Sequence, residues 1–382
     1  MTDADVLIWG EHPAGHVLGL LLASAGVRCI SASDPKAAVS EGVDGSGLAL
    51  LNEQFFRLDA RLAGLAGRVG GEPVAGLLYL AEPGRSAAYE LETSAGSVGA
   101  RAVSAEAVRD GCRALAVAAG VARPASGDFA LDSVDETGLS VRIGGTKLRI
   151  RLLILANAVH FEVAKQLNLD EPHLSRTRRA SVMLDPADVE TTRTATAHGR
   201  MVPIALDLMK QLFTGRLLQA GGLAVASVDV PAEAAGRHDP EAVLQHFLHL
   251  LHKQGVLNRL PKAGAGVMMS QFDAAGALQR EGVGDRTLCI GPAGGFYSSS
   301  GEDLYPGAWS AVFASKTLQK ALKSEHPQDE LRGFRTAWGA SLGEYLQGPQ
   351  QNLRFLESMV FDNPQMARRL AEAILGGRSV IR

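Results

Sequence analysis

A short turn near the start of the chain, residues 10–15, constrains the fold more than any other feature of the sequence. It follows an apolar run, residues 6–9, which predicts a buried strand, and it precedes an Ala- and Leu-rich run, residues 17–25, which predicts a helix packed between layers. Gly10 and Gly15 stand at the first and last glycine positions of a G-x-G-x-x-G pattern. A strand, such a turn and a helix form the first unit of a nucleotide-binding α/β fold. The sequence therefore predicts a Rossmann-like sheet.

The middle position of this turn departs from the pattern. His12 occupies the place of the second glycine, which lets the backbone approach a pyrophosphate without a side chain in between. We therefore expect Gly10, His12, Ala14 and Gly15 to line a nucleotide site that is altered where the phosphates lie. His12 and His16 are one helical turn apart and could bind a metal or a phosphate, but the pattern favours a packing or capping role.

Length, charge and cysteine usage narrow the class of protein. A chain of 382 residues is long enough for two or three domains, and 38 Lys and Arg against 41 Asp and Glu argue against a nucleic-acid partner. Three widely separated cysteines in apolar runs indicate buried thiols in a reducing compartment. The first residues are acidic, and no apolar run reaches the roughly 18 residues that span a bilayer. We expect a soluble, cytoplasmic protein without a transmembrane segment.

Downstream patterns predict further elements of the same fold. Residues 102–118 predict a helix with Ser104 as its N-cap. Three alternating runs broken by glycines predict a hairpin that leads into a buried strand; they cover residues 129–134, 139–143 and 148–155. A strand at residues 287–291 and a helix at residues 306–322 predict that this fold resumes late in the chain.

Between these parts the pattern changes to short β-type runs around one helix, residues 240–254, which indicates a second sheet inserted into the first fold. The runs cover residues 180–184, 202–206, 217–230 and 267–272. The run at residues 217–230 could line a lipophilic pocket, although plain sheet core is the favoured interpretation. The tail, residues 327–382, is expected to be helical, with Asn363 as an N-cap before Pro364.

The order of these signals resembles the flavoprotein superfamily that contains the geranylgeranyl reductases and the p-hydroxybenzoate-hydroxylase-type monooxygenases. Members share a strand–GxGxxG–helix start, a mid-chain strand ending in Asp-Gly, and a late strand ending in Gly-Asp before a glycine-rich loop and a long helix. Residues 291–296 (GPAGGF) and 301–308 (GEDLYPGA) are similar to the family's late motif and to the start of its long helix. The resemblance implies that Gly291, Gly294 and Gly295 belong to the cofactor loop.

The resemblance covers nearly the whole chain and implies an α/β protein in three parts. These are a discontinuous Rossmann-like FAD-type domain, an inserted antiparallel β-sheet substrate domain and a helical C-terminal region. Their expected boundaries are residues 1–75, 97–165 and 281–325 for the first, 76–96 and 166–280 for the second, and 326–382 for the third.

Five positions that contact FAD in that family carry other residues here, and His12 is the first. The aspartate of the late Gly-Asp, which hydrogen-bonds the ribityl side of FAD, is replaced by Pro292. Proline offers neither a carboxylate nor an N–H group. The acid that holds the adenosine ribose falls at Ser33, with Asp34 one place later. The resemblance thus implies that contacts along the whole length of the cofactor are altered.

Two further altered positions are Asn157, which with Ala158 replaces the mid-chain Asp-Gly, and Ala105, which replaces an arginine. A charge-assisted hydrogen bond is worth about 1.5–3 kcal/mol, and about 1.4 kcal/mol is a factor of ten in affinity. The five changes together therefore predict weak or absent FAD binding. The resemblance implies a flavoprotein-like protein with a degenerate FAD site, acting as a non-catalytic or altered-ligand subunit that binds a small apolar ligand or a partner protein.

An alternative is an active FAD-dependent oxidoreductase, either a reductase or a monooxygenase, that works on a bulky apolar substrate. The resemblance implies that such an enzyme would hold the flavin ring beside residues 294–301 and would take hydride from NAD(P)H. The sequence itself identifies no catalytic residue for either reaction.

A third class, a hydrolase or a metal enzyme, would use histidines or serines outside the turn. His246, His249 and His252 are three residues apart on one expected helix, without a carboxylate beside them, so we predict no metal site. The serines at 298–300 have no identifiable base, which an activated serine needs. A small basic cluster is interpreted as a surface turn rather than an anion site; it consists of Arg176, Arg178 and Arg179.

Overall fold

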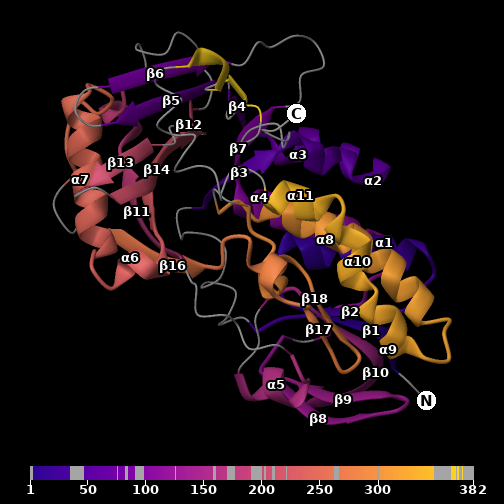
Figure 1. The fold of residues 1–382 in the computed structure, drawn as a ribbon. Coiled ribbons are helices and arrows are strands. Elements are labelled where there is room, and N and C mark those ends of the chain that lie inside the picture. Colours follow the sequence, from indigo (N-terminus) through magenta and orange to yellow (C-terminus); the bar gives the residue numbers. More distant parts are fainter. Residues whose placement is uncertain are drawn as a thin grey trace.

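The computed structural model shows a first lobe that carries the N-terminal strand and a second lobe built on a separate sheet (Figure 1). Its described residues are 3–34, 47–74, 76–81, 85–90, 99–124, 126–157, 161–169, 177–190, 200–201, 204–208, 211–220, 222–261, 266–298, 301–347, 363–366, 368–369 and 372. Within them the strands form three sheets, which we call sheets A, B and C.

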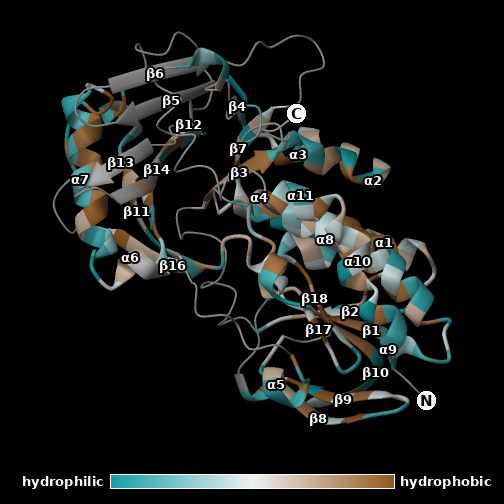
Figure 2. Cartoon of the chain, viewed as in Figure 1, coloured by the Kyte–Doolittle hydropathy of each residue, from teal (hydrophilic) through white to brown (hydrophobic). Residues whose placement is uncertain are grey.

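Sheet A is the centre of the first lobe. Its parallel strands lie in the order β18–β10–β1–β2 and span Thr287–Cys289, Thr146–Leu155, Ala4–Trp9 and Cys29–Ala32. Ile8 lies opposite Ile154 on one side and opposite Ser31 on the other. Residues 6–9 of β1 and residues 152–155 of β10 are continuously apolar (Figure 2), as parallel strands covered on both faces require. A short antiparallel strand, β17 (Val283–Gly284), pairs with β18.

Helices cover one face of the parallel part of sheet A, and a hairpin that pairs with the first half of β10 folds over the other face. The helices are α1 (Pro13–Ser24), α4 (Ala105–Ala118) and α8 (Leu304–Ala321), and the hairpin is β8–β9 (Phe129–Asp135 and Gly138–Ile143). Val6 and Ile8 pack with the helices, whereas Leu7 and Trp9 pack with the hairpin. This alternation of side chains follows from the two-residue period of a strand. Helix α1 begins a few residues after β1, at the carboxyl end of that strand.

Sheet C forms the second lobe. Its order is β12–β5–β13–β14–β15–β11–β16, with β6 beside β5. These strands span Arg200–Met201, Gly76–Ala81, Ile204–Leu208, Gln211–Ala220, Leu223–Val230, Thr177–Leu184, Val267–Phe272 and Arg85–Glu90. Helix α7 (Pro240–Lys253) packs on one face through Phe247, against apolar residues such as Ala180 and Val228. The opposite face of β11 and β15 carries Arg179 and Asp229.

Short elements complete the two lobes. Sheet B is antiparallel, in the order β3–β7–β4 (Leu48–Asn52, Ala100–Ser104, Glu72–Val74). The C-terminal helices α9, α10 and α11 pack along α8 (Figure 1) and span Pro327–Arg332, Phe334–Gly339 and Leu342–Gln347. The other short helices are α2 (Ala60–Ala63), α3 (Ala66–Val69), α5 (Phe161–Gln166) and α6 (Ala232–Ala235). The 3-10 turns are η2 (Glu53–Arg57), η3 (Pro186–Asp188), η4 (Gly276–Gln279) and η5 (Gly291–Gly294).

The α/β class, the second sheet and the helices at residues 327–347 agree with the sequence analysis, whereas most of the tail after residue 347 lies outside the described residues. Several element boundaries were wrong; for example, the strand expected at residues 287–291 ends at Cys289. The helix expected at residues 102–118 begins at Ala105, because the preceding residues form β7 and the Ser104 hydroxyl accepts the Ala107 N–H (3.2 Å). The run at residues 217–230 lies in two strands with a turn at Gly222, whose φ is 76°. Leu217 packs in the core with α7, which confirms the sheet-core interpretation of that run.

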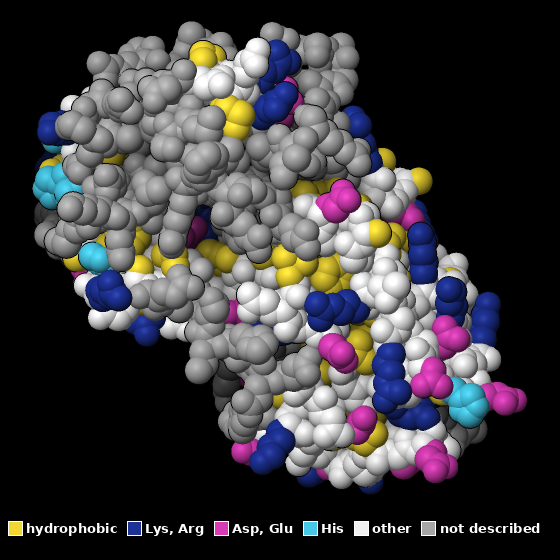
Figure 3. Space-filling view, in the orientation of Figure 1, with side chains coloured by type: hydrophobic (Ala, Val, Ile, Leu, Met, Phe, Trp, Pro, Cys, Tyr) yellow, Lys and Arg dark blue, Asp and Glu magenta, His cyan; other side chains and the backbone are white. Residues whose placement is uncertain are grey.

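Other features also follow the sequence. The three cysteines are buried and form no disulfide, and Asn363 accepts the Gln365 N–H (3.0 Å) as a helix cap. Among the described helices, none combines the length and hydropathy needed to cross a membrane. On the visible face, basic and acidic side chains interleave over the first lobe (Figure 3). The residue boundaries of the three parts stay a prediction.

Candidate functional site

The turn between β1 and α1 is tight because of two glycines. Gly10 has a φ of 120°, which other residues rarely adopt, and a Cβ there would collide with the side chain of Asn157. A Cβ on Gly15 would lie 3.0 Å from the Cβ of Ala156 and 3.1 Å from Cγ2 of Ile8. Gly10 therefore shapes the turn, and Gly15 lets α1 approach sheet A closely.

His12 caps helix α1 with its own side chain. The Ala14 N–H donates to Nδ1 of His12 (3.1 Å), and the Gly15 N–H donates to the His12 carbonyl (2.9 Å). The His12 N–H donates to Oδ1 of Asn157 (3.1 Å). The first N–H groups of a helix need acceptors from outside the helix, and a bound phosphate commonly supplies them. Here three amides of the turn donate to acceptors within the chain.

The imidazole of His12 is buried, with 6% of the residue exposed, between the turn and two other glycines. A Cβ at Gly291 would lie 2.9 Å from its Nδ1, and a Cβ at Gly307 would lie 2.9 Å from its Cε1. Its Nε2 lies 3.5 Å from Oδ2 of Asp303. Because Nδ1 accepts the Ala14 N–H, the neutral ring carries its proton on Nε2. His12 therefore joins the start of α1 to the start of α8.

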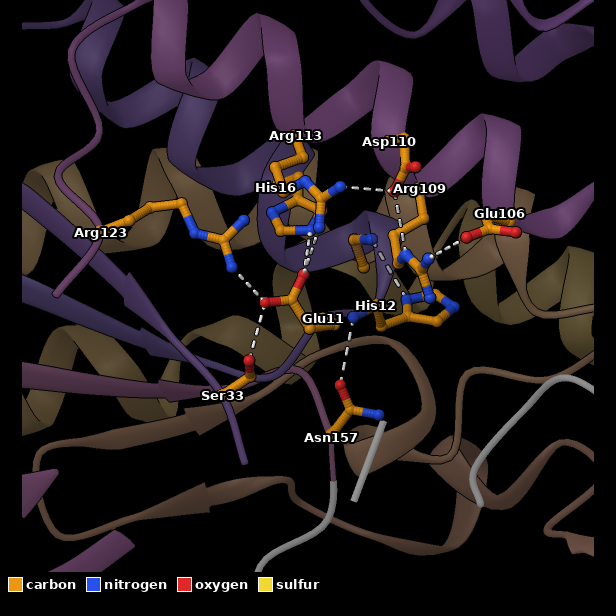
Figure 4. A network of polar contacts seen from close by, with 11 residues as sticks. Glu11, His12, His16, Ser33, Glu106, Arg109, Asp110, Arg113, Arg123 and Asn157 are labelled. Atoms are coloured by element: carbon orange, nitrogen blue, oxygen red, sulfur yellow. Dashed lines mark hydrogen bonds and ion pairs between the residues drawn. The ribbon is translucent and has the colours of Figure 1, made fainter. Parts of the chain in front are cut away.

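Glu11 extends to the other side of the turn, toward β2 and α4 (Figure 4). The Ser33 hydroxyl donates to Oε1 of Glu11 (2.7 Å), and Nε2 of His16 lies 3.2 Å from Oε2. Arg123 pairs with Oε1, and Nη1 of Arg113 lies 3.6 Å from Oε2. We call these four partners, His16, Ser33, Arg113 and Arg123, the Glu11 cradle. Ser33 was predicted as a site residue, but its hydrogen bond to Glu11 was not predicted from the sequence.

The Glu11 cradle keeps its carboxylate ionised. Burial alone would raise the pKa of Glu11, but the close contact with His16, the hydrogen bond from Ser33 and the charge of Arg123 lower the pKa to about 2. Burial lowers the pKa of His16, although contact with Glu11 opposes this. A negative charge is therefore fixed beside the turn.

A second acidic group lies at the start of α8. Oε1 of Glu302 accepts the Tyr305 N–H (2.7 Å), and the Tyr345 hydroxyl donates to Oε2 (3.4 Å). Burial and the neighbouring charge of Asp303 together raise the pKa of Glu302 to about 8, although the hydrogen bond from the Tyr305 N–H opposes the shift. Glu302 is therefore mostly protonated at neutral pH. Its contact with Tyr345 ties α11 to the start of α8.

A buried ion pair joins sheet C to the same region. Nε and Nη2 of Arg179 donate to the two carboxylate oxygens of Asp229 (2.7 and 3.1 Å). The guanidinium lies 4.6 Å from the ring centroid of Phe272, and a Cβ at Gly301 would collide with it. The interpretation of this basic cluster as a surface turn was wrong for Arg179, which is buried in β11. Arg178 is exposed, and Arg176 lies outside the described residues.

The predicted cofactor positions fall into two groups. Gly10, His12, Ala14, Asn157 and Gly291 are in mutual contact at the turn. The remaining ones lie at other places, namely Gly15 within α1, Ser33 and Asp34 after β2, Ala105 at the start of α4, Pro292 and Gly294 in η5, and Gly295 after it. The Ala105 N–H donates to the carbonyl of Gly47 (3.0 Å). Ala158 lies outside the described residues.

The other candidate residues have local partners. Nδ1 of His249 lies 2.7 Å from the carbonyl of Gln245, and Nδ1 of His252 lies 2.9 Å from that of Leu257. Throughout the described part of the chain, no group of three His, Cys, Asp or Glu residues is arranged to hold a metal ion. Oγ of Ser298 accepts the Glu302 N–H (3.1 Å), and the serines 299 and 300 lie outside the described residues.

Sequence reasoning missed most partners of the turn. Glu11 stands inside the glycine motif, and Asp303 and Gly307 stand inside the late motif, but none of the three was predicted as a site residue. Arg113 and Arg123 carried no motif signal, because tertiary structure brings them to Glu11. Arg113 reaches it through the packing of α4 against α1, whereas Arg123 follows Ala122, which pairs with Ile30 of β2. A charged residue inside a glycine turn was the one signal that pointed to this network.

Comparison with solved structures identifies the fold. A variant of the flavin-dependent brominase Bmp2 superposes with a TM-score of 0.68 at 15% identity, over 97% of this chain and 94% of that one. A geranylgeranyl bacteriochlorophyll reductase-like protein from Thermoplasma acidophilum gives 0.68 at 13%, over 97% and 96%. PqsL, a probable FAD-dependent monooxygenase from Pseudomonas aeruginosa, gives 0.63 at 17%, over 94% and 100%. No family model and no curated sequence matches the chain.

The chain therefore has the fold that the flavin-dependent brominase, the reductase-like protein and the probable FAD-dependent monooxygenase share, along almost its full length. This confirms, at the level of fold, the resemblance drawn from the sequence.

The contact between Gly307 and His12 gives a first prediction. We expect Gly307→Ala to destabilise the protein by about 1–3 kcal/mol, because its Cβ would overlap the imidazole. In a His12→Ser background, which keeps a capping side chain, most of this penalty should disappear. Urea unfolding of the four proteins of the double-mutant cycle measures the coupling. Gly67→Ala is the control, because open space surrounds Gly67 in helix α3; equal penalties at both glycines would contradict the prediction.

The raised pKa of Glu302 gives a second prediction. The folded state holds the proton of the Glu302 carboxyl more tightly than the unfolded state does. The contribution of this proton to the free energy of unfolding is therefore fully present below pH 4.5 and is lost as pH rises toward about 8. The free energy of unfolding should fall by up to about 1.4 kcal/mol per pH unit in this window from this group. Glu302→Gln should flatten the slope in urea titrations, and Glu344→Gln, at an exposed site in α11, should not. Identical slopes in all three proteins would refute the assignment.

Proposed function

We propose that this protein uses the fold of FAD-dependent oxidoreductases without binding FAD as those enzymes do. It would act as a non-catalytic binding or partner subunit, or as a protein that takes another ligand. One observation carries the proposal: His12 caps helix α1 and fills the space between Gly291 and Gly307. The amides that would bind a pyrophosphate in such a turn donate to the chain's own acceptors instead.

Charge supports the proposal as much as shape. A pyrophosphate in the turn would have to displace the His12 cap, and losing an N-cap costs about 0.5–2 kcal/mol. It would also approach the carboxylate of Glu11, whose pKa of about 2 keeps it ionised. Pro292 offers no N–H and no carboxylate on the facing turn η5. The residues present therefore do not fit FAD held through this turn.

The ligand or partner of such a subunit would be a small molecule or another protein. The apolar residues of β11 and β15 that face α7 are used in the core of sheet C. The opposite face carries the buried Arg179–Asp229 pair, with Ser181 and Ser227 beside it. This polar face favours a ligand that carries at least one polar group, rather than the apolar ligand expected from the sequence.

An active FAD-dependent oxidoreductase that uses NAD(P)H is the second candidate, and the fold of the three solved relatives favours it. For this chain it would require His12 to leave its position between Gly291 and Gly307. Flavin binding distinguishes the two candidates directly.

The third prediction is that the purified protein is colourless and gains no bound flavin when FAD is added. The expected result follows from the closed turn, since the amide donors already have acceptors. Absorbance spectra after gel filtration, with and without an excess of FAD, measure the bound flavin. A yellow protein with stoichiometric FAD would overturn the proposal and establish the second candidate.

The fourth prediction concerns restoring the cofactor contacts. We expect a variant with His12→Gly, Ser33→Glu and Pro292→Asp, combined with Glu11→Ala to make room beside Ser33, to bind FAD more tightly than the parent. The gain should be roughly tenfold for each restored charge-assisted contact. His12→Gly alone should gain little, because it removes a side chain without supplying a hydrogen bond. Quenching of flavin fluorescence measures the affinities. A folded combined variant that binds no better would show that other side chains close the site.

A further inference from the structure

The Glu11 cradle has the composition of an anion-binding site. Four donor groups from four different segments converge on one carboxylate: His16 from α1, Ser33 from the end of β2, Arg113 from α4 and Arg123 from the segment after α4 (Figure 4). Three of the segments are anchored in the core of the first lobe. The donors are therefore held in place by the fold.

The carboxylate of Glu11 does not accept hydrogen bonds from all the donors of the cradle. Oε2 of Glu11 and Nε2 of His16 lie 3.2 Å apart, yet neither forms a well-directed hydrogen bond, and His16 is only 1% exposed. Nη1 of Arg113 stands 3.6 Å from the same oxygen, which is longer than a direct hydrogen bond. An unsatisfied buried nitrogen is costly. The cradle thus has more donor capacity than two carboxylate oxygens use.

The donor set matches a phosphate monoester. Arginine is the preferred residue for phosphate because its planar fork presents several N–H groups to the oxygens. A phosphate monoester offers three terminal oxygens and up to two negative charges, against the two oxygens and one charge of Glu11. Arg113 also pairs with Asp110 (2.8 Å). We therefore expect Arg123 and His16 to exchange Glu11 for the phosphate, Arg123 through its positive charge and His16 through its ring N–H.

The position in the fold suits a phosphorylated ribose. The cradle lies after β2, and in Rossmann-type sheets the end of this strand meets the ribose of a dinucleotide. An arginine at this place accommodates a phosphate on the ribose. Ser33 stands there, and Arg123 and Arg113 flank it through Glu11.

We propose that the Glu11 cradle binds a phosphate monoester and that Glu11 is an internal competitor that occupies the site when the ligand is absent. This inference rests on the proposed function, because it assigns the altered ligand chemistry of the same turn. The ligand is either a phosphorylated ribonucleoside or free phosphate.

The test is isothermal titration calorimetry with three probes: inorganic phosphate, adenosine 2′-monophosphate and adenosine. We expect Glu11→Ala to bind phosphate at least roughly tenfold more tightly than the parent, because the competing charge is gone. Arg123→Ala in the Glu11→Ala background should remove this gain. A preference for adenosine 2′-monophosphate over inorganic phosphate identifies a ribonucleoside ligand, equal affinities identify free phosphate, and adenosine alone should not bind.

Two controls keep the result decisive. Asp59→Ala exposes Arg61 in a matched surface pair (2.6 Å between Oδ1 and Nε), and it should gain no phosphate affinity. Glu11→Gln keeps the size of the side chain, and it should show a smaller gain than Glu11→Ala, so the test stands if the alanine variant does not fold. The proposal is overturned if folded Glu11 variants bind phosphate no more tightly than the parent, or if Asp59→Ala gains equally. None of these titrations contains FAD, so the proposed function can fail independently of this one.

Discussion

The hydrogen bond from the Ala14 N–H to the His12 imidazole decides what the rest of this molecule can do. A helix that begins at the carboxyl end of a parallel strand presents N–H groups that need acceptors. In a dinucleotide-binding turn the ligand is one of those acceptors. Here His12 and Asn157 supply them from within the chain. The backbone of the turn is therefore kept, while two of its N–H groups have acceptors within the chain.

Neighbouring groups lead from this turn, past the start of α8, to sheet C. His12 faces Asp303, and the adjacent Glu302 accepts the N–H of Tyr305 in α8. Gly301, next to Glu302, lies against the guanidinium of Arg179 in sheet C. Asp229 neutralises that guanidinium. The segment before α8 thus lies against both the turn of the first lobe and the buried ion pair of sheet C.

The sequence predicted the scaffold well because its signals are local. The apolar runs of β1 and β10, the glycines of the turn and Ser104 as a cap each act within a few residues. The contacts of Glu11 with Arg113 and Arg123 could not be predicted in this way, since they depend on how α4 packs against α1 and on how the segment after α4 pairs with β2. Likewise, nothing local in the sequence places Gly307 against His12. Backbone geometry follows from short patterns, whereas side-chain partners follow from the packing of distant elements.

The strand order has a consequence for biosynthesis. Strand β18 begins at Thr287 and pairs with β10, which ends at Leu155, and most of sheet C lies between them in the sequence. Sheet A therefore stays incomplete until that inserted sheet has left the ribosome, whereas most of sheet C can pair among its own strands earlier. Such a long sequence separation slows closure of the sheet and exposes the apolar edge of β10 meanwhile. We therefore expect the nascent chain to be most prone to aggregation while the residues between β10 and β18 are being synthesised.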